Sequence, residues 1–148
     1  MIRRAITVLA AAMTASSLTG CTGHSDPPIS GPQTTTIEVS YDDLLNQKHI
    51  TRKLTLNIGD TLQVSLGSNP STGFSWAPDM QITNPAVLAQ TGHEVLAPTT
   101  DRPGAPAREV WAIQAMAPGS TTLSTNYGRP WPGGEKDAWT FAADVTVN

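Results

Sequence analysis

Few side chains in this sequence have the types and spacing that catalysis requires. His93-Glu94 lacks the second histidine of a zinc-binding His-Glu-x-x-His motif, His49 lies among polar residues, and His24 lies in a stretch rich in proline and glycine. The sequence contains neither a Gly-x-Ser-x-Gly nucleophile motif nor a glycine loop that could cradle phosphate. The pattern therefore predicts a protein that is not an enzyme.

Carboxylate pairs are the remaining candidates for a metal site. Asp42-Asp43 and Glu135-x-Asp137 could offer oxygen ligands to Ca²⁺, but exposed loop carboxylates are the favoured interpretation. We expect neither a metal nor any other cofactor.

The formal net charge of −3 also excludes a globally basic surface, so no nucleic-acid partner is expected.

Two proline-containing segments, at residues 69–74 and 129–131, instead have the composition of binding loops. In the first, Pro70 stiffens the chain before the tip and Gly73 permits a tight return, so docking would cost little conformational entropy. In the second, Trp131 offers a large, mostly exposed surface beside the permanent charge of Arg129, and both residue types are enriched at binding hot spots. The alternative is that Trp131 is a partly buried scaffold aromatic stacked under Arg129.

The elements that must hold these segments are strands, because apolar and polar residues alternate with a period of two from Thr36 onward. Twenty Thr and eleven Ser also shift the composition towards strands, which Thr favours. Phe74 and Trp76 open one strand and are expected in the core, Gly92 suggests a bulge, and residues 41–47 could hold one helical turn. The expected strands cover residues 37–41, 54–58, 62–66, 74–76, 87–96, 109–116, 121–127 and 139–147.

This spacing predicts an all-β fold, an immunoglobulin-like β-sandwich or barrel of about eight antiparallel strands. Residues 53–66 are expected to form a hairpin that turns at Gly59-Asp60. Successive antiparallel strands would bring the connections after strands three, five and seven to one end of the domain, as three clustered binding loops. These connections are residues 67–73, 97–107 and 128–135, and the tight turns at Gly59-Asp60 and Pro118-Gly119 fall at the other end.

The two binding-loop segments resemble those of a known family. Chagasin-like inhibitors of papain-type cysteine peptidases (family I42) have an NPTTG(Y/F) loop, which resembles Asn69-Pro70-Ser71-Thr72-Gly73-Phe74. The family's RPW loop is similar to Arg129-Pro130-Trp131. Each motif alone is weak, since Asn-Pro and Thr-Gly are generic turn formers. Their order and spacing on an eight-strand pattern make the resemblance specific, and it covers residues 37–147.

The resemblance implies a wedge of three loops that fills a papain-type active-site cleft, with Ser71-Thr72 nearest the catalytic cysteine of the peptidase. The implied partner is therefore a papain-type cysteine peptidase, bound by a monomer. The residues implied to contact it are Asn69, Pro70, Ser71, Thr72, Gly73, Phe74, Arg102, Gly104, Arg129, Pro130 and Trp131.

The middle loop departs from the family pattern. Where the family has a GxGG stretch before a strand with a Glu, this chain has Gly104-Ala105-Pro106-Ala107, followed by Arg108 and Glu109. Pro106 has no N–H to donate. The alternative function is a non-inhibitory immunoglobulin-like module for binding or assembly at the cell surface, because such sandwiches host many functions.

The N-terminus has the features of a lipoprotein signal. Arg3 and Arg4 precede an uncharged, mostly apolar run at residues 5–17, and Leu18-Thr19-Gly20-Cys21 resembles a bacterial lipobox. The resemblance implies cleavage before Cys21, the only cysteine, and lipid on that residue. An ordinary signal peptide with an incidental cysteine is the alternative. We expect a protein at the cell membrane, lipid-anchored and facing outside the cytoplasm.

The expected organisation has three parts. Residues 1–20 form the lipoprotein signal peptide, residues 21–35 the lipidated cysteine with a flexible tether, and residues 36–148 the inhibitor domain. A flexible tether of about 14 residues would have a root-mean-square reach of about 20 Å. Cleavage would remove two arginines and change the net charge from −3 to −5.

Overall fold

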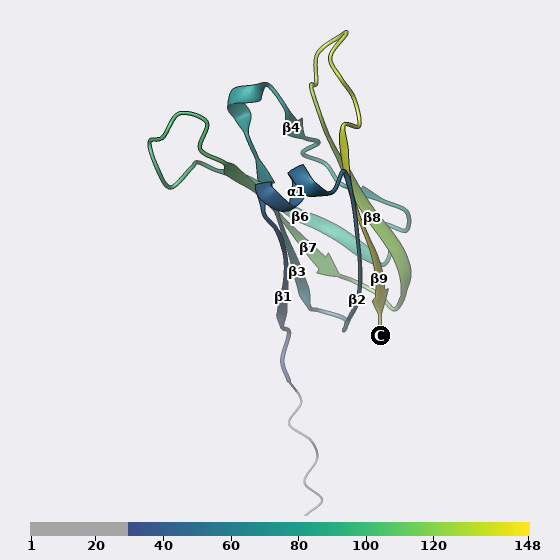
Figure 1. Cartoon of the computed structure of the whole chain (residues 1–148). Coiled ribbons are helices and arrows are strands. Elements are labelled where there is room, and N and C mark those ends of the chain that lie inside the picture. Colours follow the sequence, from purple (N-terminus) through teal and green to yellow (C-terminus); the bar gives the residue numbers. More distant parts are fainter. Residues whose placement is uncertain (1–29) are drawn as a thin grey trace, which may run out of the picture.

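The computed structural model describes residues 30–148 (Figure 1). Within this range the segments of alternating apolar and polar residues form strands. The predicted signal peptide and Cys21 lie outside the described residues. The strands are β1 (Thr34–Val39), β2 (His49–Leu56), β3 (Thr61–Ser68), β4 (Ser75–Trp76), β5 (Gln81–Ile82), β6 (Leu88–Leu96), β7 (Ala107–Ala115), β8 (Gly119–Gly128) and β9 (Trp139–Val147). A helix, α1 (Tyr41–Asn46), and a 3₁₀ turn, η1 (Pro70–Thr72), complete the set.

These strands form two sheets that pack face to face. One has the order β1-β3-β7-β6, and the other has the order β2-β9-β8-β4, with β5 also paired to β8. Inward-facing residues of both sheets meet in one core, whose largest fully buried side chains are Trp76, Trp111, Tyr127 and Phe141. The predicted sandwich is confirmed, whereas the described strands form two open sheets and no closed barrel.

The pairing corrects two predictions. The strands are not all antiparallel, because β1 runs parallel to β3 and β2 runs parallel to β9. The hairpin expected at residues 53–66 is also wrong: the turn at Gly59-Asp60 exists, but it carries the chain from one sheet to the other. The buried Leu56 and Leu62 face the same core from opposite sheets, and alternation alone gives both arrangements the same pattern.

The helix α1 is longer than the single turn expected at residues 41–47, and its start explains why it forms. Ser40 and Asp43 make a capping box, in which the Ser40 hydroxyl accepts the Asp43 N–H and the Asp43 carboxylate accepts the Ser40 N–H. Leu44 is buried against the core, and its carbonyl accepts the indole N–H of Trp139 at 2.7 Å. The helix follows β1 of one sheet, and its contact with Trp139 joins it to β9 of the other sheet.

Other predicted features are confirmed. Trp76 is buried and Phe74 packs against the core, as expected for residues that open a strand. The register of β6 against β7 shifts between Gln90 and Gly92, which is the bulge suggested by that glycine. No helix within residues 30–148 combines the length and the apolar character needed to cross a membrane.

Candidate functional site

Three connections gather at one end of the sandwich: loop 69–74 after β3, loop 97–106 after β6 and loop 129–138 after β8 (Figure 1). They meet there because β3 and β6 are both antiparallel to β7, and β8 is antiparallel to the strand that loop 69–74 enters. The side-chain amide of Asn69 donates to the Gly104 carbonyl at 3.3 Å, and an Arg129 guanidinium nitrogen lies 3.5 Å from the Thr72 carbonyl. The predicted clustering of the loops is confirmed.

The tip of loop 69–74 is a single 3₁₀ turn that its own residues hold closed. The Asn69 carbonyl accepts both the N–H of Thr72, at 3.1 Å, and its hydroxyl, at 2.6 Å. The Pro70 carbonyl accepts the Gly73 N–H at 3.0 Å, and the Ser71 hydroxyl donates to the side-chain oxygen of Asn69. Proline at the first helical position costs no hydrogen bond there. The turn is therefore preorganised, while Ser71 and Thr72 remain exposed.

Gly73 is required at its position for two reasons. Its φ is +79°, in the left-handed region that glycine adopts without steric cost. A Cβ added there would lie 2.5 Å from Cη2 of Trp131, because the indole of the neighbouring loop packs directly on this glycine. The two loops with sequence motifs are therefore in contact through a residue of each motif.

Loop 129–138 is held by its own backbone and by one lysine. The Arg129 N–H donates to the Glu135 carbonyl at 2.7 Å, and the Gly134 N–H donates to the Trp131 carbonyl at 3.0 Å. The ammonium group of Lys136 reaches back to the carbonyls of Arg129 and Trp131, at 2.8 Å for the latter. The role of Lys136 was not predictable from the sequence, because nothing in its spacing marks a side chain that bonds to carbonyls five and seven residues earlier.

Trp131 has features of both interpretations that the sequence left open. Its side chain is 46% exposed, so about half of the indole is available to a partner and half is covered. The Arg129 guanidinium lies 4.6 Å from the ring centroid of Phe74 and 6.0 Å from that of Trp131, so it connects the two motifs by cation–π contacts. Trp131 is thus exposed, as expected, but to less than half of its surface, because its ring packs on Gly73.

Loop 97–106 leans outward from the other two (Figure 1). Gly104 has a φ of +76°, and the Arg102 carbonyl accepts the Ala105 N–H at 3.0 Å, so a tight turn forms just before Pro106. Arg102 and Gly104 are both exposed. The departure from a glycine-rich middle loop thus preserves a left-handed turn at Gly104.

An aromatic cluster under the loops supports them. Phe74, Trp76 and Trp139 surround Tyr127, with ring centroids 4.9 to 5.6 Å from the tyrosine ring. The Tyr127 hydroxyl accepts the Asn69 N–H at 2.9 Å, and burial raises the pKa of this phenol. The sequence pattern predicted only that Tyr127 lies in a strand. Its position at the end of the strand before loop 129–138 was the one indication that it could also support the loops.

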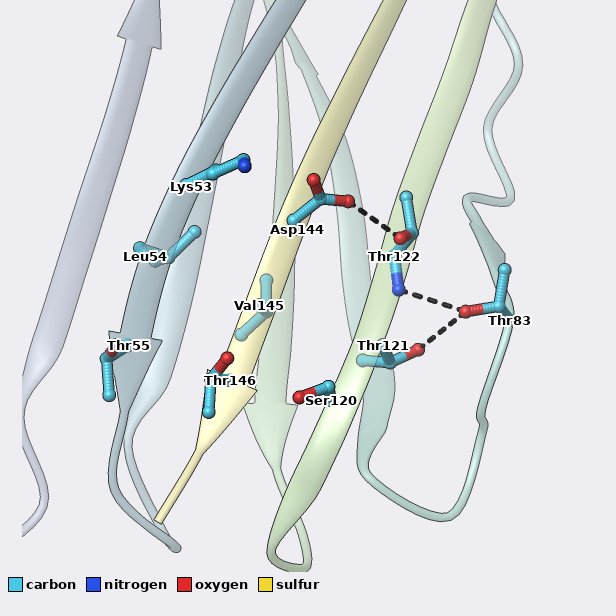
Figure 2. A pocket seen from close by; sticks show the side chains of 10 residues that line it. All are labelled: Lys53, Leu54, Thr55, Thr83, Ser120, Thr121, Thr122, Asp144, Val145 and Thr146. Atoms are coloured by element: carbon cyan, nitrogen blue, oxygen red, sulfur yellow. Dashed lines mark hydrogen bonds between the residues drawn. The ribbon is translucent and has the colours of Figure 1, made fainter.

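The remaining candidates do not form a site. No group of three or more potential metal ligands occurs within residues 30–148, and Asp43 of the Asp42-Asp43 pair serves the helix cap. A shallow hollow of about 560 Å³ lies on the outer face of β2, β9 and β8 (Figure 2). Hydrogen bonds already occupy several of its polar groups: the Thr122 hydroxyl donates to Asp144 at 2.8 Å, and the Thr122 N–H donates to Thr83 at 2.9 Å.

Rigid, clustered loops on a β-sandwich are the architecture of a protein that binds its partner through its loops. Residues 55–145 match the family described as "Chagasin family peptidase inhibitor I42", and the chain belongs to that family. Family members are peptidase inhibitors, in agreement with the prediction that this chain is not an enzyme.

Three relatives illustrate the similarity. Chagasin of Trypanosoma cruzi is 25% identical over 107 residues, which cover 70% of this chain and 96% of chagasin. The crystal structure of the cysteine protease inhibitor EhICP2 from Entamoeba histolytica has a TM-score of 0.60 and 21% identity, covering 80% of this chain and all of that one. The structure of PbICP-C in complex with falcipain-2 has a TM-score of 0.54 and 22% identity, covering 78% and 99% of the two chains. The two structural similarities support the fold.

Proposed function

We propose that this domain inhibits papain-type cysteine peptidases by inserting its three loops into the active-site cleft as a wedge. The observation that carries the proposal is the contact between the two motif loops, in which Trp131 packs on Gly73 beside the closed turn of residues 70–72. The turn and the exposed half of Trp131 form one continuous rigid surface. Family membership and the cysteine peptidase inhibitors among its relatives support the choice of target class.

The geometry suggests why the tip would occlude a peptidase without being cleaved. The carbonyl groups of Asn69 and Pro70 already accept hydrogen bonds within the turn. Cleavage needs a scissile carbonyl that enters an oxyanion hole, so these carbonyls would first have to break their internal bonds. Rigidity also limits the entropy lost on binding, because the turn has its bound shape beforehand.

Titration of papain with the purified soluble domain tests the proposal. Stoichiometric inhibition that saturates at one domain per active site is the expected result. Absence of inhibition at micromolar concentrations would contradict it and favour the non-inhibitory cell-surface module. Size-exclusion chromatography with light scattering on the same sample tests the accompanying proposal that the inhibitor is a monomer.

We also propose that the protein is a lipoprotein, processed before Cys21 and held at the cell membrane outside the cytoplasm by lipid on that cysteine. The lipobox resemblance of Leu18-Thr19-Gly20-Cys21 supports it. Thr34 pairs with Thr61 at the end of the sandwich opposite the three loops, so such an anchor would leave the wedge pointing away from the lipid. Two or more acyl chains are needed for stable attachment, because one chain binds only marginally.

Replacement of the cysteine tests the anchor. The Cys21→Ala protein should stay unprocessed and carry no acyl chain, as judged by intact mass and by metabolic labelling with a fatty acid. A Cys21→Ala protein that is still acylated and cut before residue 21 would contradict the assignment.

A further inference from the structure

A buried carboxylate, paired with a partly buried histidine, joins the roots of two of the three loops. Glu109, the third residue of β7 after loop 97–106, is only 5% exposed. Its Oε1 accepts the backbone N–H of Trp76 at 3.3 Å, and Trp76 lies in β4, directly after loop 69–74. Its Oε2 lies 3.1 Å from Nε2 of His93, in β6, which leads into loop 97–106. One carboxylate on β7 therefore contacts two further strands that border the site, β4 and β6.

These contacts connect the two sheets at the end that carries the loops. Glu109 and His93 belong to the sheet of β1, β3, β7 and β6, whereas Trp76 belongs to the other sheet. In the register of β3 against β7, Glu109 lies opposite Leu66, two residues before β3 ends and loop 69–74 follows. The His93 ring also stacks on the buried Trp111 at a centroid distance of 4.9 Å, which fixes the orientation of the imidazole.

A buried carboxylate at this position lowers the stability of the fold unless its charge is compensated. Taking an ion out of water carries a desolvation penalty, and an apolar residue of similar volume often stabilises a fold equally well or better. Two hydrogen-bonding partners on different elements offset part of that penalty and confer geometric definition. The arrangement is therefore better explained by placement of the loops than by the stability of the core.

We propose that Glu109 is a positioning residue for the inhibitory wedge. With His93 as its partner, Glu109 holds the end of loop 69–74 against β6 and β7, the two strands that flank loop 97–106. The proposal rests on the proposed inhibitory function, since it concerns the spacing of the loops that bind the peptidase. Its consequence is that inhibition depends on the ionisation of Glu109.

The groups that face Glu109 determine the direction of that dependence. Within residues 30–148, His93 from β6 is its only ion-pair partner. The phenol of Tyr127 from β8, with Tyr41 from α1 nearby, faces the same region. Burial raises the pKa of the Glu109 carboxyl, against the opposing effect of the hydrogen bonds from His93 and Trp76. The carboxylate therefore gains its proton at a higher pH than an ordinary glutamate, and its hold on the Trp76 N–H weakens as the pH falls.

The test compares wild type with Glu109→Gln, which keeps the shape and an acceptor oxygen but removes the charge. The inhibition constant for papain is measured from neutral to acidic pH, and the ratio of the two constants removes the ionisation of papain itself. We expect Glu109→Gln to bind about tenfold more weakly at neutral pH, the usual scale for a hydrogen bond to a charged group, and the ratio to approach one in acid. A ratio of one throughout, or one that does not change with pH, would overturn the proposal.

Glu94→Gln is the matched control. Glu94 is the exposed neighbour of His93 in β6, so the same change of charge there should leave the inhibition constant unchanged at every pH. If Glu109→Gln does not fold, His93→Gln replaces it: loss of the imidazole should move the pH transition of inhibition upward. An unmoved transition in a folded His93→Gln domain would equally overturn the proposal.

A second readout separates this proposal from the inhibitory function. The backbone amide resonance of Trp76, followed by NMR in the free wild-type domain, should titrate with Glu109 and should lose that titration in Glu109→Gln. If wild type fails to inhibit papain but the Trp76 amide titrates as described, the proposed function is wrong and the contact between Glu109 and Trp76 stands. If papain is inhibited but the Trp76 amide does not respond to pH, the positioning role of Glu109 is wrong and the inhibitory function stands.

Discussion

Truncation of Trp131 to alanine separates binding from folding most sharply. The backbone carbonyl of Trp131 accepts hydrogen bonds from Gly134 and Lys136, and these bonds persist in the variant because they do not involve the side chain. The substitution therefore removes the indole alone. The loop that carries it should keep its shape.

The structure sets the magnitude. A tryptophan side chain can bury about 250 Å², so 46% exposure leaves about 115 Å² for a partner to cover. At about 25 cal/mol per Å² this area corresponds to about 3 kcal/mol, or about 100-fold in the inhibition constant. By the same conversion the covered half, about 135 Å², sets an upper bound of about 3 kcal/mol on the loss of folding stability. The unfolded chain already covers part of that area and the indole packs on Gly73 outside the core, so the expected loss is about 1–2 kcal/mol.

The assay pairs papain inhibition with thermal unfolding of the same samples. Met116→Ala is the matched control, since Met116 is 51% exposed, at the turn between β7 and β8, away from the three loops. It should change neither quantity appreciably. A large fall in the melting temperature of Trp131→Ala, together with unchanged inhibition by the folded fraction, would refute the reasoning and make Trp131 a scaffold residue.

Three further predictions concern a loop glycine, a comparison of the core with the loop tip, and a carboxylate at the opposite end of the sandwich. Gly73→Ala should lose about 1–2 kcal/mol of stability from the left-handed backbone and should weaken papain inhibition by displacing Trp131; unchanged inhibition would show that the two loops act separately. Val145→Ala, at a position 1% exposed, should lose about 1–3 kcal/mol yet inhibit normally while folded, whereas Thr72→Ala should weaken inhibition with little change in melting temperature. Asp60→Asn should melt at a lower temperature than wild type at neutral pH, because two backbone N–H groups hold the pKa of the Asp60 carboxyl below its usual range. That difference should disappear as the pH falls through the depressed pKa, where wild type is protonated too; a difference that persists there would show that the charge is not the cause.

The strands were largely predictable, since a period of two reports which residues face the core. The alternation at residues 139–147 corresponds to β9, and the irregularity at Gly92 corresponds to the bulge of β6. Pairing was not predictable in the same way. The apolar residues around Leu56 and Leu62 fit a hairpin and a crossover between sheets equally well, because both bury the same side chains.

The motif residues could be identified from the chain, but their supports could not. Asn69 depends on the hydroxyl of Tyr127, 58 positions away, and the carbonyl of Trp131 depends on Lys136. Glu109 matched the family pattern in sequence, but its contacts were not predictable, because its partners Trp76 and His93 lie on other strands. Such contacts arise from folding and leave no local pattern.

The sequence by itself determined the β-sandwich class, the two loop motifs and their placement on connections between strands, because these follow from local alternation and from the backbone preferences of proline and glycine. Only the tertiary structure decided that β1 and β2 pair in parallel, that half of Trp131 is covered by Gly73, and that Glu109 links two loop roots. The physical reason is that pairing and burial depend on which distant residues compete for the same space, and the order of residues along the chain does not specify that competition.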